Sequence, residues 1–103
     1  MPDGSSAGRR TGGWTFLSNH GHVLIALSRD PRARLRDVAE AVGITERAVL
    51  LILSDLESEG VVKRIREGRR NRYMLNLEAP LRHPLEEHRT AGELVAMVEG
   101  RRS

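Results

Sequence analysis

Apolar residues recur at helical spacing along three successive segments before residue 60, which predicts three helices. The first follows a cap at Ser18 or Asn19 and runs to about Arg29. Pro31 ends it, because proline has no N–H to continue the helix. Residues 32–35 are expected to form a short strand. The apolar face of this helix consists of Val23, Leu24 and Leu27.

A glycine turn separates the second and third predicted helices. The second runs over about residues 36–42, and Gly43 follows it, where a left-handed cap favours a residue without a β-carbon. The third begins at Thr45, its cap, and extends to Glu59 before Gly60. Its core-facing positions are Ala48, Val49, Ile52, Leu53 and Leu56.

From residue 61 the spacing of apolar residues changes from helical to alternating, which predicts a two-stranded hairpin. Residues 73–77 alternate between core-facing and exposed positions. The loop is expected at residues 67–71, with Gly68 and Asn71 at its tip. One face of this hairpin should pack on the core.

Pro84 is suited to the first position of a final helix that runs to about Glu99. Glu86 and Glu87 would lie in its opening turn, near the positive end of the helix dipole. Gly92 lowers the helix propensity by about 1 kcal/mol relative to alanine, so this helix must rely on packing. Its apolar stripe is Leu85, His88, Ala91, Leu94, Val95 and Val98.

The chain thus divides into one small folded domain and two loose ends. Residues 1–13 are rich in glycine and serine and are expected to be a disordered tail, as are residues 101–103. Residues 14–78 form the main domain and residues 79–100 the terminal helix. The expected fold is mainly helical with a small hairpin, of the α+β class. A chain of 103 residues has a small core, which favours pairing with a second copy.

Positive charge is concentrated in the predicted hairpin. The formal net charge is only +3, but the segment from Lys63 to Arg72 contains six basic residues and a single acidic residue, Glu67. Arginine supplies almost all of this charge, and its guanidinium makes forked contacts to phosphate or guanine. Cysteine is absent, which excludes disulfides and thiolate metal sites. With no apolar run for a signal peptide or a membrane span, the protein is expected to be soluble and cytoplasmic.

The segments LRDVAEAVG, ITERAVLLILSDLESEG and KRIREGRRNRY follow one another in the order helix, turn, helix and basic hairpin. This order resembles a winged helix-turn-helix DNA-binding domain of the ArsR or MarR type of transcriptional regulator. The resemblance implies a recognition helix at residues 45–60, a wing at residues 64–72 and a double-stranded DNA partner. The element order would be helix, short strand, helix, helix, strand, strand, helix. No catalytic motif is present, so an enzyme is not expected.

DNA contacts are expected from the exposed arc of the recognition helix and from the wing. Arg47 can read guanine, Thr45 can hold a phosphate, and the wing arginines can grip phosphates or a narrow minor groove. Leu50 and Leu51 are unusual on such an arc and could touch thymine methyl groups or a partner protein. The expected DNA-contact residues are Arg36, Thr45, Glu46, Arg47, Leu50, Leu51, Ser54, Arg64, Arg66, Arg69, Arg70, Asn71 and Arg72.

A homodimer is expected, with each copy on one half-site. Its contact residues would be Trp14, Phe16, Leu17, Leu85, His88, Leu94, Val95 and Val98. No cofactor is required, but a small organic effector or a divalent metal such as zinc or nickel is compatible. His20, His22, His83 and His88 invite a metal interpretation, and His83, Glu87 and His88 could contribute to an ArsR-type site, although no ligand spacing of that family is matched. A winged-helix module that docks a protein through Leu50 and Leu51 is a further alternative.

Overall fold

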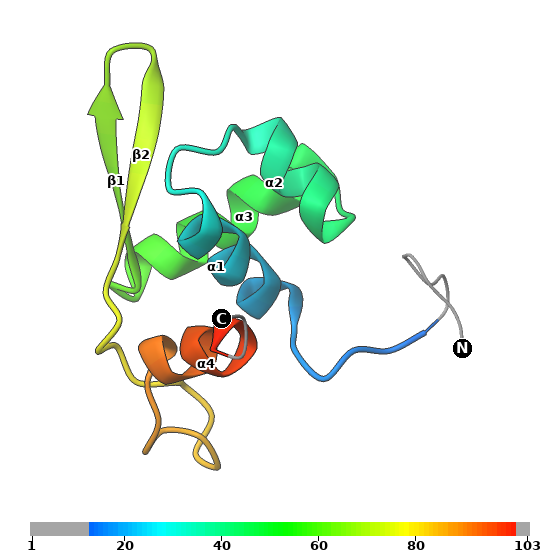
Figure 1. Ribbon diagram of the computed structural model, residues 1–103, viewed down its shortest axis with the longest axis vertical. Helices are drawn as coiled ribbons and strands as arrows, with labels where there is room; N and C mark the ends of the chain where they lie inside the picture. The colour runs from blue at the N-terminus through cyan, green and yellow to red at the C-terminus, as the bar shows by residue number, and fades with distance from the viewer. Residues whose placement is uncertain (1–12, 101–103) are drawn as a thin grey trace.

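Four helices and one hairpin make up residues 13–100, the part of the chain that the computed structural model describes (Figure 1). The elements are α1 (Asn19–Arg29), α2 (Leu35–Val42), α3 (Glu46–Ser58), β1 (Val62–Glu67), β2 (Arg70–Leu75) and α4 (Ala91–Glu99). The mainly helical fold with a small antiparallel hairpin is confirmed. The predicted tails lie outside the described residues, except for Gly13. Among the described helices, none is long and apolar enough to cross a membrane.

Helices α1 and α3 begin where side chains of the N-cap residues cap them. Ser18 accepts a hydrogen bond from the Gly21 N–H at 3.4 Å, and Thr45 accepts one from the Ala48 N–H at 3.0 Å. Gly43, with a φ of 87°, supplies the left-handed cap of α2. The predicted helices are therefore confirmed to within one residue at these starts.

The core lies between α1, the buried face of α3 and the base of the hairpin. Helix α1 crosses in front of α3, and α4 packs against the other side of α1 (Figure 1). Val23 and Leu27 of α1 and Val49 of α3 have no exposed surface, and Leu53 is 1% exposed. Val62 and Tyr73 attach the hairpin to this core. The hairpin then projects away from the helices (Figure 1).

The predicted strand at residues 32–35 is wrong, because its amides are used by a turn. The Arg32 N–H binds the Asp30 carboxylate at 3.0 Å, and the Ala33 N–H binds the Asp30 carbonyl at 3.1 Å. Pro31 has no N–H to donate to a ladder. Only its carbonyl reaches the hairpin, where it accepts from the Tyr73 N–H at 2.9 Å.

The predicted start of the last helix at Pro84 is also wrong. Thr90 caps α4, because its hydroxyl accepts from the Glu93 N–H at 3.1 Å while the Glu93 carboxylate accepts from the Thr90 N–H at 2.9 Å. Residues 81–89 instead form turns that are closed at their base by an antiparallel bridge between Pro80 and Thr90. Leu85 and His88 therefore do not lie on a helix.

The hairpin loop is shorter than the sequence suggests. Glu67 pairs with Arg70, so the loop contains only Gly68 and Arg69. Gly68 has a φ of 62°, which tight hairpin turns require at their first central position. Asn71 is not at the tip, because it lies within β2 opposite Arg66. The tight turn aligns the two strands and fixes which arginines share a face.

Candidate nucleic-acid interface

Helix α3 has one buried face and one exposed face, as its sequence pattern predicts. Val49, Ile52, Leu53 and Leu56 are buried, whereas Arg47, Leu50, Leu51, Ser54 and Ser58 are exposed. Leu50 is 46% exposed and Leu51 is 63% exposed, so neither is covered by another part of the described chain. The exposed face is therefore free to meet a partner, and its centre is apolar.

The N-terminus of α3 presents mixed charge. The Thr45 oxygen accepts from the Ala48 N–H, which leaves the hydroxyl proton free to donate to a phosphate. Glu46 is exposed beside it. A carboxylate there stabilises the helix but repels phosphate, although it can accept from the amino group of cytosine. Arg47 makes no ion pair among the described residues, so its guanidinium is free.

Arg64 joins the hairpin to α3 instead of standing free. It donates to Glu57 through Nε at 3.0 Å and through Nη2 at 2.7 Å, which is a forked pair. The hydrogen bond from Arg64 lowers the pKa of the Glu57 carboxyl below its usual range, and the same bond raises the pKa of Arg64. The predicted phosphate contact by Arg64 would have to compete with this pair.

The other hairpin arginines divide by what they bind. Arg72 donates to the Glu67 carboxylate at 2.8 Å, and this bond is the main cause of the lowered pKa of Glu67. Arg70 donates to the Arg32 carbonyl at 2.6 Å. Arg66 uses Nε to bind the Gly68 carbonyl at 2.8 Å, and neither Arg66 nor Arg69 forms an ion pair among the described residues. Lys63 is also exposed on β1 and forms no ion pair among the described residues, so Lys63, Arg66 and Arg69 are the most available cations of the hairpin.

The sequence patterns do not indicate that Glu57, Glu67 and Arg32 are partners of the hairpin arginines. Glu67 and Arg72 are diagonal neighbours once the loop contains two residues, so a correct loop length would have indicated that pair. Arg32 forms an ion pair with Glu67 at 3.0 Å, although the two residues are 35 positions apart in the sequence. No local sequence pattern predicts that contact. Arg36 is exposed on α2, and Asn71 is half-buried in β2. Both stay predictions as DNA contacts.

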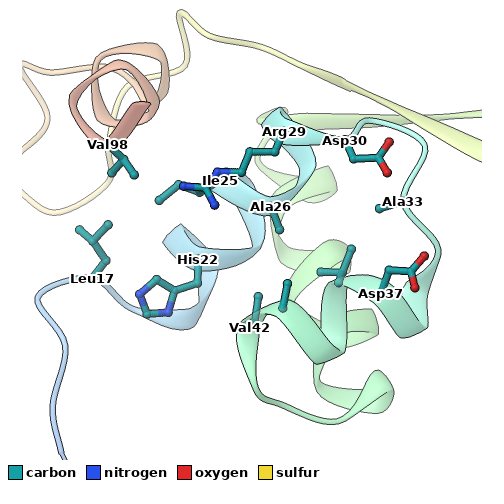
Figure 2. Close-up of a pocket in the computed structure, with 12 residues that line it drawn as sticks. Leu17, His22, Ile25, Ala26, Arg29, Asp30, Ala33, Asp37, Val42 and Val98 are labelled. Carbon is teal, nitrogen blue, oxygen red and sulfur yellow. The ribbon is translucent and has the colours of Figure 1, made fainter. Parts of the chain in front are cut away.

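A hollow of about 590 Å³ lies between α1, α2 and the end of α4 (Figure 2). Its lining is largely apolar, and charged or polar side chains stand at its edges. Arg29 at the edge is paired with Glu99 at 2.6 Å. The apolar lining includes Leu17, Ile25, Ala26, Val42 and Val98, and the polar residues include His22, Arg29, Asp30 and Asp37. The hollow is a candidate site for a small amphiphilic molecule.

The residues predicted for a dimer contact do not form one helix stripe. Trp14 is 77% exposed and Phe16 is 92% exposed, so neither ring packs against the body of the domain, and their place in a dimer contact stays a prediction. Their rings contact each other edge to face, with centroids 5.0 Å apart. Leu94 and Val95 pack partly against the chain's own core, whereas Leu85 is 80% exposed in the turns before α4. His88 is exposed in the same turns.

Three histidines form hydrogen bonds within the described chain. His20 lies 2.8 Å from Asp55, His22 lies 3.1 Å from Asn19, and His83 accepts from the Leu85 N–H at 3.0 Å. Within residues 13–100, no three histidine or acidic side chains are grouped closely enough to hold a metal ion. Metal binding stays a prediction.

A family model for winged helix-turn-helix DNA-binding domains matches residues 18–63. The transcriptional regulator PcaV from Streptomyces coelicolor, bound to its natural ligand, aligns with a TM-score of 0.53 at 24% identity, over 84% of this chain and 63% of PcaV. MepR, which regulates the Staphylococcus aureus multidrug efflux pump MepA, aligns with a TM-score of 0.51 at 22% identity, over 80% and 54%. Lactococcus lactis ZitR in complex with DNA aligns with a TM-score of 0.53 at 17% identity, over 92% and 66%. No curated protein matches the chain by sequence.

These likenesses concern the fold and the matched segment. The chain spans between 54% and 66% of the length of the three regulators. The matched family model describes DNA-binding domains, and the structural neighbours PcaV and MepR are transcription regulators. ZitR is a zinc-responsive MarR family member, and the likeness to ArsR-type regulators stays a prediction. The chain thus contains a segment similar to winged helix-turn-helix DNA-binding domains, and its described residues share the fold of these solved regulators.

Proposed function

We propose that the chain is a transcriptional regulator that binds double-stranded DNA through α3 and the wing, the hairpin of residues 62–75. One observation carries this proposal: the forked pair between Arg64 and Glu57 ties the wing to α3. A helix of this kind enters a major groove, while an adjacent wing reaches the backbone or the minor groove. Arg47, Arg66 and Arg69 are among the exposed cations that this arrangement leaves without an acidic partner in the described part of the chain.

The proposed regulator acts as a homodimer on two half-sites. Trp14, Phe16 and Leu85 are large apolar side chains that a folded monomer would leave in water. A second copy that covers them would bury apolar surface, which stabilises association by about 25 cal/mol per Å². Two-fold symmetry would place the half-sites about one helical turn of DNA, or a multiple of it, apart.

We further propose that a small molecule binds this chain and regulates its DNA binding. The hollow in Figure 2 combines an apolar lining with edge residues that can donate or accept hydrogen bonds. The structure of PcaV holds a natural ligand of that regulator, which supports an effector for a chain of this fold. A compound that binds in the hollow would act if its affinity differs between the free and the DNA-bound protein.

The proposal is tested by selecting duplexes from a random pool and titrating the best one at several salt concentrations. Because arginine contacts release counterions from DNA, affinity should fall steeply between about 50 and 200 mM salt. An affinity that hardly changes over this range would contradict the proposal. The same titration with and without added zinc or nickel tests the metal alternative.

A protein-docking module is a second candidate, which the exposure of Leu50 and Leu51 favours. These leucines offer apolar surface but cannot hydrogen-bond base edges. The double variant Leu50→Gln, Leu51→Gln separates the two functions. DNA binding should persist or improve in this variant if the chain is a DNA regulator, whereas a protein partner that docks on the leucines would be lost.

A further inference from the structure

Glu67, the only acid of the wing, binds guanidinium groups from two different elements. Arg72, which lies on β2, donates to one carboxylate oxygen of Glu67 at 2.8 Å. Arg32, in the loop between α1 and α2, reaches the other oxygen through Nε at 3.1 Å and Nη2 at 3.0 Å. This carboxylate therefore links the tip of the wing to the helical body.

Two further bonds converge on the same loop. The Arg70 guanidinium donates to the Arg32 carbonyl at 2.6 Å, and the Tyr73 N–H donates to the Pro31 carbonyl at 2.9 Å. In Figure 1 this loop passes beside β2. An isolated two-stranded hairpin is only marginally stable, so its outer half needs such support.

Without Glu67 the same contacts would place three cations together. Arg32, Arg70 and Arg72 all lie around this point, and like charges at close range repel. The carboxylate offsets that repulsion and fixes two of the side chains. We propose that Glu67 and Arg32 form a latch that holds the wing at a set position relative to α3, which makes both of them positioning residues for DNA binding.

The latch accounts for the presence of an acidic residue, Glu67, in a wing that is otherwise positively charged and proposed to bind DNA. The negative charge of Glu67 weakens binding to any phosphate backbone. Its benefit is geometric, because a fixed wing reaches the duplex at the same time as α3 and loses less conformational entropy on binding. Removing the charge should therefore raise affinity for arbitrary DNA and lower the preference for a selected duplex.

The first test uses the free protein and does not depend on DNA binding. Amide hydrogen exchange of Tyr73 is compared in the wild type, Glu67→Gln and Arg32→Gln. Each substitution removes an ion pair at the surface, so Tyr73 exchange should accelerate roughly two- to five-fold while the amide of Leu53 in α3 keeps its rate. The two substitutions change net charge in opposite directions, so a shared effect cannot come from net charge.

A control substitution, Glu87→Gln, removes the same charge from an exposed turn where Glu87 has no ion-pair partner among the described residues. It should leave Tyr73 exchange unchanged. An unchanged Tyr73 rate in Glu67→Gln, or an equal acceleration at Tyr73 and Leu53, would overturn the latch.

The second test rests on the proposed function and uses the duplex selected by the wild type and a scrambled duplex. Glu67→Gln should reduce the ratio of the two affinities roughly two- to five-fold, the same range as for the lost ion pair. Glu87→Gln should keep the ratio. If the protein binds neither duplex, the proposed function fails, while the exchange result still decides whether the latch exists. A preserved ratio in Glu67→Gln would limit the latch to stability and overturn its role in DNA binding.

Discussion

Gly92→Ala in α4 should destabilise the protein, although alanine is the better helix former. A β-carbon at residue 92 would lie 2.7 Å from the carbonyl oxygen of Leu77 and 2.9 Å from its Cβ. The Gly92 N–H also donates to that carbonyl at 2.8 Å, so the two backbones cannot separate without loss of a hydrogen bond. The close approach of α4 to the chain after β2 thus requires glycine.

The change in the free energy of unfolding is the sum of one stabilising and two destabilising contributions. Gly92 lies in the first turn of α4, where replacing glycine by alanine contributes up to about 1 kcal/mol of stability. Forcing an extra carbon into a tight contact costs about 1–3 kcal/mol, and weakening the hydrogen bond to Leu77 costs about 0.5–1.5 kcal/mol. The free energy of unfolding should therefore fall by about 0.5–4.5 kcal/mol in Gly92→Ala.

The same substitution at Gly21 in α1 provides the control. A β-carbon there would lie 3.4 Å from Leu17 Cβ and 3.9 Å from Leu94 Cδ2, which are ordinary contacts. Gly21→Ala should raise the free energy of unfolding by about 0.4–1 kcal/mol. Urea unfolding of both variants and the wild type at equal protein concentration measures the difference. A Gly92→Ala variant as stable as Gly21→Ala would show that the contact with Leu77 does not require glycine at residue 92.

Three further predictions concern the caps, the pH response and the association of the chain. Thr45→Ala removes the hydrogen bond from the Ala48 N–H. Urea titrations should therefore show a free energy of unfolding that is lower by about 1 kcal/mol. An unchanged midpoint of urea unfolding would mean that this cap contributes nothing to stability. The pKa of Glu57 is lowered in the folded state by its bond to Arg64, so its stabilisation is present above the unfolded pKa and is lost as pH falls through the folded value. Glu57→Gln should flatten the loss of stability between neutral and acidic pH, and an identical pH profile would argue against this pair. Trp14→Ser with Phe16→Ser should weaken self-association in analytical ultracentrifugation and leave the far-UV spectrum unchanged; a variant that associates like the wild type would remove these rings from the proposed contact.

The helices up to residue 60 could be predicted because their signals are local. Apolar spacing, the cap at Thr45 and the glycine at residue 43 each act within a few residues. The exposed arc of α3 followed from the same spacing. The final helix was misplaced because Pro84 and the acids after it also suit a helix start, whereas the stronger signal was the capping box of Thr90 and Glu93.

The arrangement of the arginines could not be predicted in the same way. Their number and clustering identified the wing, but their partners depend on contacts between distant segments. Arg32 meets Glu67 only after the fold brings the loop before α2 to the tip of the hairpin. The Asp30 turn that replaced the expected strand depends on a side chain competing for backbone amides, which alternation patterns do not detect.

Salt-dependent DNA binding of a wing variant tests most directly whether α3 and the wing engage one duplex. Arg69→Gln removes an exposed cation at the hairpin turn, and Arg82→Gln removes one from the turns before α4 as a control. If Arg69 contacts a phosphate, the slope of log affinity against log salt should become shallower by about 0.9 in Arg69→Gln and stay at the wild-type value in Arg82→Gln. Equal slopes for Arg69→Gln and the wild type, on the duplex that the wild type selects, would contradict a wing contact by Arg69. Wild-type binding that is insensitive to salt would contradict the DNA interface as a whole.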